Sequence, residues 1–336
     1  MQSMKPERSP QKDHECETHG ENPRRSNLYA LGPFAMPMLL VGMFVLFCIL
    51  APEAFASYSN FRITIGAQSI IVLLALALMV PMRAGDFDLS VSAVMVLSGV
   101  TVGVLYAAEL PFALACAVAL LVGPIAGLLN AVLVVLLDFD SLIATLGTMT
   151  VLSGLASLVS NNALVTSIPD ELIMFSIERM LGYASPVWIG WLFALLIWFV
   201  FDHTATGNHL LAIGADRKDA ELAGVQATRL RIWAFVFSGS LSALVGLLYA
   251  GSLGAVSATA STSYLLPPIT AVFLGASAIQ LGRYNVGGTL IAIYLLAIGN
   301  AGLQLLGLHD WIVDVFNGLC LIGAIAFANI FHGRGD

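Results

Sequence analysis

The chain has 336 residues, of which 58% are hydrophobic and 10% are charged, and its mean hydropathy is +0.89. Soluble domains carry about 25% charged residues, so this composition excludes a water-soluble fold. The net charge of -7 excludes no further class of protein. A membrane protein is oriented by where its Lys and Arg residues lie in the chain, and not by their total number. The sequence therefore predicts an all-α, polytopic membrane protein with about ten transmembrane helices.

Residues 1–27 precede the first long apolar run and differ from the rest in composition. They are polar, mixed in charge and almost free of large apolar side chains, which is typical of a disordered segment. The basic pair Arg24 and Arg25 stands directly before a long apolar run, whereas a secretory signal peptide has a short apolar stretch soon after its basic start. We expect a disordered cytoplasmic tail at 1–27 and a membrane domain at 28–336.

Apolar runs follow one another through the membrane domain. A requirement of roughly 20 apolar residues per crossing places spans near 34–51, 64–82, 88–107, 112–137, 141–160, 185–201, 232–253, 264–280, 286–306 and 311–331. Two of these are weak, because 141–160 is rich in Ser, Thr and Gly and 264–280 contains Pro267 and Pro268. Both are candidates for a short, broken or re-entrant helix.

The basic residues gather on one side of the predicted membrane. With these spans and a cytoplasmic amino terminus, only Arg62 and Arg179 of the 14 basic residues fall outside. The inside positions are Lys5, Arg8, Lys12, Arg24, Arg25, Arg83, Arg217, Lys218, Arg229, Arg231, Arg283 and Arg334. Because Lys and Arg concentrate in cytoplasmic loops, the pattern predicts that both termini are cytoplasmic.

Two hydrophilic segments separate spans, an external one at 161–184 and a cytoplasmic one at about 202–231. In the second, residues 216–222 mix charged side chains with Ala and Leu and precede Gly224, which predicts a short surface helix that ends at a glycine. Such a helix is either a solvated connection, as most charge-rich loops are, or a docking element for a cytoplasmic partner.

The sequence gives no sign of enzymatic chemistry. The lysines are Lys5, Lys12 and Lys218, and none follows a Gly in a Gly-Lys-Ser/Thr context, which excludes a P-loop for ATP. His14 and His19 in the tail have a superficial likeness to a zinc protease motif, but they are five positions apart rather than four. We expect a transport subunit with no cofactor and no metal of its own.

The span interiors are small and neutral. Secondary transporters and proton pumps usually carry acids or bases at mid-membrane, whereas the small and polar residues inside these spans are uncharged, namely Gly, Ala, Ser and Thr with a few amides. Most such residues pack helices together, and the alternative is that some line a path for an uncharged, hydroxyl-rich solute. On that alternative the path residues are Asn130, Thr145, Thr148, Asn300 and Gln304.

Four stretches carry a family resemblance. They are GDFDLSV at 85–91, SLIATLGTMT with GLA at 141–156, the segment 212–225, and FLGAS, GR and GGTL within 273–290. In this order they resemble the Gly-Gly-Ile-Asp-Leu-Ser-Val-Gly signature, the Thr-Leu-Gly-Thr span, the ATPase-contacting loop and the late glycine-rich segment of bacterial ABC importer permeases of the ribose, xylose, galactose and autoinducer type. The resemblance runs from about residue 60 to 325.

The chain departs from that signature at several positions. Phe87 stands where the family usually has Ile, and Asp86 and Ser92 replace glycines. Arg83 adds a charge before the motif and is close enough in sequence to pair with Asp86 at the membrane surface. These departures indicate a divergent subgroup.

The resemblance implies an inner-membrane subunit that pairs with a second, identical or homologous permease around a translocation path. A periplasmic solute-binding protein would deliver a sugar or polyol, and a separate cytoplasmic ATPase would bind the ATP. The residues it implies for ATPase coupling are Asp216, Ala220, Glu221, Leu222 and Gly224. Those it implies for a gate are Asp86, Asp88, Leu89 and Ser90. No nucleic-acid partner is expected, and a stand-alone secondary transporter or channel for a small neutral solute is the alternative.

Overall fold

The computed structural model describes residues 23–280, 282–309, 311–313, 315–320 and 322–323. Its contacts divide the chain into two compact units, Met1–Leu31 and Gly32–Asp336, and the helical bundle belongs to the second. The predicted tail lies outside the described residues up to residue 22, whereas residues 23–27 already belong to the first helix, α1 (Pro23–Leu50).

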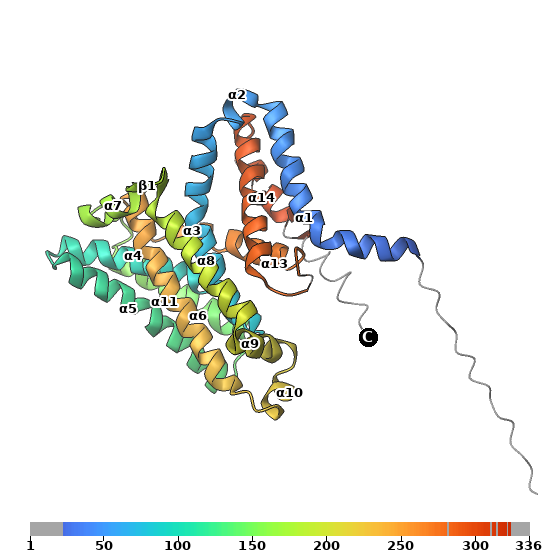
Figure 1. Ribbon diagram of the computed structural model, residues 1–336. Helices are drawn as coiled ribbons and strands as arrows, with labels where there is room; N and C mark the ends of the chain where they lie inside the picture. The colour runs from blue at the N-terminus through green and yellow to red at the C-terminus, as the bar shows by residue number, and fades with distance from the viewer. Residues whose placement is uncertain (1–22, 281, 310, 314, 321, 324–336) are drawn as a thin grey trace, which may run out of the picture. The chain divides into compact units, whose positions relative to one another are not determined.

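Helices account for all the regular structure of the described residues except one hairpin, in which β1 (Arg179–Met180) pairs antiparallel with β2 (Tyr183–Ala184) (Figure 1). The long apolar helices after α1 are α3 (Tyr58–Arg83), α4 (Val91–Ala107), α5 (Phe112–Ala131) with its π-helical continuation η1 (Val132–Leu136), α6 (Ser141–Val159), α8 (Ser185–His203), α11 (Ala227–Leu253) and α14 (Val286–Leu305). Short helices in the connections are α2 (Pro52–Phe55), α7 (Asp170–Ile177), α9 (Ala205–Ala215), α10 (Arg217–Leu222), α12 (Ala260–Ser263) and α13 (Leu266–Gly275).

The predicted all-α membrane fold is confirmed. Within the described residues, six helices are long and apolar enough to cross a bilayer, and shorter apolar helices lie at Met36–Leu50, Val91–Ala107 and Trp311–Cys320. The last predicted span, 311–331, lies partly outside the described residues.

The two spans that the sequence predicts only weakly differ in the structure. The span at 141–160 is the regular helix α6, whose N-cap Asp140 accepts a hydrogen bond from the backbone of Ile143. The span at 264–280 is broken, because the helix α13 covers only Leu266–Gly275 of it and the residues that follow form turns and bends. The prolines of α13 stand in its first turn, where a missing N–H costs no helical hydrogen bond.

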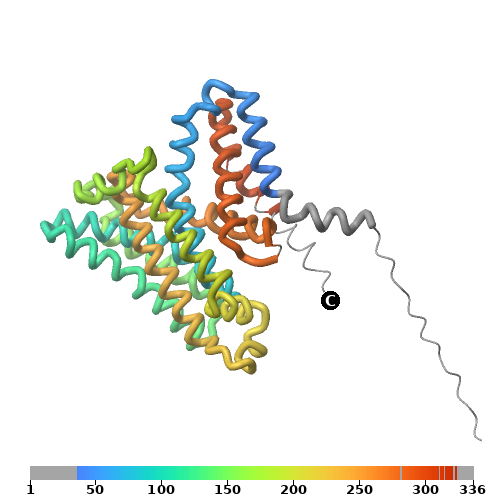
Figure 2. Tube along the Cα trace, in the orientation of Figure 1, coloured from blue at the N-terminus to red at the C-terminus, as the bar shows by residue number. Residues whose placement is uncertain are grey.

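Contacts between distant connections define two ends of the bundle. At one end Val165 and Val256 form a β-bridge, and Gly251 of α11 lies against α7. At the other, which we call the basic end, Arg217 pairs with Asp138 at 3.5 Å. Figures 1 and 2 show α9 and α10 at this end, and α7 and β1 at the opposite one. The described basic residues at the basic end are Arg83, Arg217, Lys218, Arg229, Arg231 and Arg283.

Helix α11 runs through the centre of the bundle and packs on α4 and α5 through glycines. Gly239 of α11 and Gly123 of α5 face each other so closely that a Cβ on either would overlap the backbone of its partner. Gly246 meets Met95 and Gly99 of α4 in the same way. Such contacts suit a bilayer, where helices associate through close packing because lipid offers no hydrophobic driving force between them.

Gly239→Val therefore should force α11 and α5 apart and lower the free energy of unfolding by about 1–3 kcal/mol or more. The measurement is the thermal unfolding midpoint of the detergent-purified protein. Gly42→Val is the matched control, since nothing lies within 4 Å of a Cβ at that position. Equal midpoints for the two variants would contradict the packing described here.

Candidate functional site

The connection between α3 and α4, residues 84–90, contains most of the first family-like stretch, and we call it the signature loop. Its entry is a tight turn in which Gly85 has a φ of +85°, a conformation that L side chains rarely adopt. A Cβ on Gly85 would lie 3.4 Å from the Cα of Gly214 in α9. The glycine pair therefore lets α9 lie directly against the loop.

Asp88 is fully buried at the centre of the loop and is held by hydrogen bonds from three elements. Its Oδ1 accepts from Ser90 N and Oγ, at 3.1 and 2.6 Å, and from Asn130 Nδ2 of α5, at 3.1 Å. Its Oδ2 accepts from Ser238 Oγ of α11 at 2.8 Å. A buried carboxylate is costly unless it is hydrogen-bonded, so Asp88 fixes α4, α5 and α11 around the loop.

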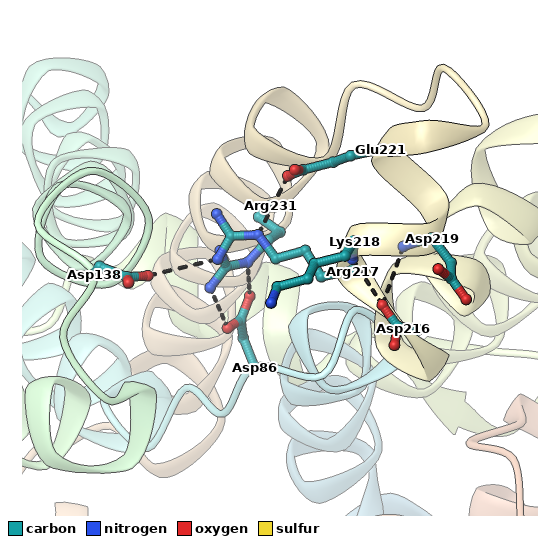
Figure 3. Close-up of polar contacts among 8 residues, drawn as sticks. All are labelled: Asp86, Asp138, Asp216, Arg217, Lys218, Asp219, Glu221 and Arg231. Carbon is teal, nitrogen blue, oxygen red and sulfur yellow. Dashed lines mark hydrogen bonds and ion pairs between the residues drawn. The ribbon is translucent and has the colours of Figure 1, made fainter.

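Asp86 forms a buried ion pair with Arg231 of α11. The guanidinium donates through Nε and Nη2 to the two carboxylate oxygens, at 2.6 and 2.7 Å, in a two-pronged geometry (Figure 3). The expected pairing of Asp86 with Arg83 is therefore wrong. Arg83 lies at the end of α3 and its guanidinium donates to the carbonyls of Phe201, Gly207 and Tyr284 at 3.1, 3.3 and 3.1 Å, which satisfy its N–H groups instead.

The remaining contacts of the loop reach α6 and α13. The backbone N–H of Phe87 donates to Ser141 Oγ, and that of Leu89 donates to Thr145 Oγ1, both at 3.1 Å. The Phe87 ring stacks on Phe273 of α13 with 6.0 Å between ring centres. The phenylalanine that departs from the family signature thus connects the loop to the broken span.

The predicted gate residues lie together in this loop, and two of the predicted path residues contact it. Asn130 and Thr145 are fully buried and donate to or accept from loop atoms, while Thr148 bonds the carbonyl of Ala144 in its own helix. Asn300 and Gln304 lie in the last turns of α14, near its contact with α2. A path role for these residues stays a prediction.

The predicted short surface helix is confirmed as α10. Asp216 caps it by accepting from the backbone of Lys218 and Asp219, at 2.8 and 3.1 Å (Figure 3). Gly224, just beyond its end, has a φ of +86°. The predicted coupling residues differ in exposure, because Ala220 is buried, Glu221 pairs with Arg217 at 3.4 Å, and Leu222 is 86% exposed.

Three connections tie the exposed helix to the signature loop or to its neighbours. Helix α9, which precedes α10, contacts Gly85 through Gly214. Helix α11, which follows α10, carries Arg231 to Asp86. Arg217 of α10 itself reaches Asp138, beside the N-terminus of α6. The helices that precede and follow α10 in the chain therefore both contact the loop.

The sequence did not indicate α9, nor the partners Arg231 and Ser238. These two side chains are seven residues apart on α11, a spacing that places them on one helical face. The bonds they make to Asp86 and Asp88 span 145 and 150 residues, so local pattern cannot reveal them.

The described residues thus form a helical membrane bundle with a tightly tied loop at one end and an exposed helix, α10, at the same end. Residues 36–325 match the family described as branched-chain amino acid transport system / permease component. The chain belongs to this family.

Two kinds of relative are similar to the chain over most of its length. The chain is 29% identical over 290 residues to the autoinducer 2 import system permease protein LsrC of Yersinia pseudotuberculosis, covering 86% of this chain and 83% of that protein. It is 28% identical over 294 residues to the ribose import permease protein RbsC of Haemophilus influenzae, covering 86% and 91% respectively. No solved structure matches the chain.

The chain is accordingly the permease component of a binding-protein-dependent ABC importer, a multi-pass membrane subunit without catalytic activity of its own. Such a permease works with an ATPase and a solute-binding protein. This membership removes the stand-alone transporter or channel from consideration.

Asp88→Ala should leave the hydroxyls of Ser90 and Ser238 and the amide of Asn130 without their acceptor, at about 1–3 kcal/mol for each buried group. We expect a lower unfolding midpoint and loss of transport, with Asp88→Asn intermediate because one acceptor oxygen remains. Asp170→Ala, an exposed carboxylate in the first turn of α7, is the control. Parental stability and transport for Asp88→Ala would remove the gate assignment.

The ion pair makes a separate prediction through a double-mutant cycle. Arg231→Met or Asp86→Asn alone should cost about 3–5 kcal/mol, because each leaves an uncompensated buried group. The double variant should be less destabilised than the sum of the two, as residues in direct contact are coupled. Strictly additive unfolding midpoints would show that the pair does not hold α11 to the loop.

Proposed function

We propose that this permease imports a small, uncharged, hydroxyl-rich solute, a sugar or related polyol, across the bacterial inner membrane. The solute arrives on a periplasmic binding protein at the end opposite to the basic one, and a cytoplasmic ATPase drives the cycle from the basic end. The observation that carries the proposal is that both helices next to the exposed α10 contact the buried signature loop, α9 through Gly214 and α11 through Arg231, while Arg217 of α10 pairs with Asp138 beside α6.

The charge distribution supports this orientation. The basic end holds most of the basic residues of the described bundle, whereas Arg62 and Arg179 lie toward the opposite end, near the β1–β2 hairpin. Loops rich in Lys and Arg stay in the cytoplasm. The even number of predicted spans then returns the carboxyl terminus to the cytoplasm beside the amino terminus.

Helix α10 supplies the docking surface for the ATPase. Leu222 is 86% exposed on a helix that is otherwise charged, and the groove beside it is lined by Glu221, Val225, Arg229 and Trp233 among others. In this groove Val225, Ile232 and Trp233 lie beside the charged Glu221 and Arg229, and an apolar patch rimmed by polar residues is typical of a contact with another protein. The ATP and its metal belong to that partner, so the permease needs no cofactor.

The relatives guide the choice of solute. Their names specify autoinducer 2 and ribose, whereas the family description names branched-chain amino acids. An amino acid carries two charges that a membrane site must neutralise, at considerable cost. The neutral span interiors of this chain therefore favour an uncharged solute. A second permease, identical or homologous, would complete the path.

The test is uptake by proteoliposomes that contain the chain, its co-purifying ATPase and the binding protein encoded with it. Radiolabelled ribose and autoinducer 2 are the probes, and leucine is the competitor from the alternative solute class. ATP-dependent accumulation of either hydroxylated probe supports the proposal. Accumulation of leucine alone would contradict the solute class, and accumulation without ATP would contradict the coupling.

Glu221→Arg and Gly224→Trp should each abolish uptake and leave membrane insertion intact. Glu221 is half-exposed and its ion pair is worth at most about 1 kcal/mol, so charge reversal changes the docking surface more than the fold. Gly224 has a positive φ, and a bulky residue there distorts the end of α10. Glu171→Arg, the same reversal in exposed α7 at the opposite end, is the control. Parental uptake in both loop variants would exclude α10 as the coupling element.

A further inference from the structure

A groove of about 520 Å³ lies between α6 and the segment that contains α12, away from the signature loop. Its lining residues are Met149, Thr150, Ser153, Gly154, Ser157, Ala258, Thr259, Ser261 and Thr262. Six of them carry a hydroxyl and all are uncharged. We call this the hydroxyl groove, and we propose that it is the part of the translocation path that binds the hydroxyls of the solute, an inference that rests on the proposed function.

The two walls come from separate elements whose hydroxyls face each other. On α6, Thr150, Ser153 and Ser157 follow at intervals of three and four, which places them on one face of the helix. From the other wall, Ser261 lies 3.2 Å from Ser153, oxygen to oxygen. Packing of a single helix does not account for this arrangement, because the hydroxyls of both walls converge on the same space.

The exposed surface of α6 is divided between two kinds of side chain. One part consists of large apolar residues that include Val151, Leu155 and Leu158, which are 59%, 40% and 71% exposed. The other consists of the hydroxyl groove, where Thr150 is exposed and a Cβ on Gly154 would meet nothing within 4 Å. The large apolar residues suit contact with lipid, and the hydroxyl groove suits contact with water or a polar solute.

The broken span supports a wet groove. Between the end of α11 at Leu253 and the start of α13 at Leu266, the described chain contains only the four-residue helix α12, so the segment that leads into the predicted span 264–280 is largely irregular. Irregular backbone at membrane depth is tolerated only where protein buries it or a water-filled cavity borders it. The hydroxyl groove supplies such a cavity beside α12, as in transporters whose discontinuous helices border the substrate site.

The available hydrogen-bonding groups fit a polyol. Thr150 and Thr262 donate to backbone carbonyls of their own segments, at 2.9 and 3.0 Å, so their oxygens remain free to accept. Ser153 and Ser261 share one hydrogen bond, which leaves one hydroxyl hydrogen for another acceptor. Neutral hydroxyls bind weakly, and weak binding lets a solute leave as readily as it enters.

The position along α6 agrees with this role. Ser153 stands eight residues beyond Thr145, which is about 12 Å along the helix from the signature loop toward the opposite end. The chain then runs from α12 into α13, whose Phe273 stacks on Phe87. A solute that enters from the opposite end meets the groove before it meets the loop.

Cysteine accessibility tests the groove without knowledge of the solute. Thr150→Cys and Ser157→Cys are compared with Val151→Cys and Leu158→Cys, all in the complete transporter with native cysteines replaced by serine. A positively charged, water-soluble methanethiosulfonate should react with the groove thiols about tenfold faster or more, because only hydrated thiols ionise readily. Equal or slower reaction would overturn the proposal. The proposal would also be overturned if Thr150→Cys formed disulfides between two copies of the chain and the reagent did not reach this thiol. That result would indicate a dry contact between the two copies.

Measurements of uptake provide a second test of the hydroxyl groove. In the proteoliposomes, Ser153→Ala with Ser261→Ala should lower kcat/KM for the transported probe about three- to tenfold, as expected for one or two lost hydrogen bonds. Ser240→Ala is the control, since that hydroxyl bonds only Val236 of its own helix among the described residues. Unchanged kcat/KM in the double variant would contradict solute binding in the groove. Absence of uptake by the parental complex would count against the proposed solute, and the accessibility result would still stand.

Discussion

The arrangement of the basic end depends on one buried carboxylate. Asp88 has no exposed surface, and its charge is tolerable only because Ser90, Asn130 and Ser238 donate to it. These donors come from the start of α4, from α5 and from α11, so the carboxylate holds these three helices together. The neighbouring pair of Asp86 and Arg231 adds a second fixed point on α11. Polar groups that must all be satisfied specify geometry more sharply than apolar packing does.

This constraint explains how an ATPase can act on a path that it does not touch. Helices α9, α10 and α11 are consecutive in the chain and meet the signature loop through Gly214 and Arg231. Because the loop also binds α6 through Ser141 and Thr145, the proposed function requires that a shift of α10 reach α6, which borders the hydroxyl groove. Rigid-body motion of packed elements is the usual form of such transitions, since cores do not deform continuously. Under the proposed function, three tasks are separated along the bundle, with docking at α10, coupling at the loop and solute contact in the groove.

The sequence predicted those features that depend on local pattern. Hydrophobic length located the spans, Pro267 and Pro268 marked the broken one, and Gly224 marked the end of α10. The sequence did not predict contacts between residues that are far apart in the chain and meet only in the folded protein. The pairing of Arg83 with Asp86 was inferred from closeness in the chain and was wrong, because Arg231 lies nearer in space. The path residues were selected by side-chain type, and Asn130 and Thr145 make their bonds inside the bundle. The hydroxyl groove was missed because its walls are about a hundred residues apart, as the 108-residue separation of Ser153 and Ser261 shows.

Site-specific photo-crosslinking in native membranes tests the central claim, that the ATPase acts through α10. A photoreactive amino acid would replace Leu222 in one strain and Leu181 in another. Leu181 is 77% exposed in the β1–β2 hairpin at the opposite end, and so provides a matched exposed leucine. The account predicts that mass spectrometry finds a P-loop ATPase crosslinked at position 222 and none at position 181. An ATPase crosslinked at 181, or repeatedly absent from 222 while transport remains active, would contradict it.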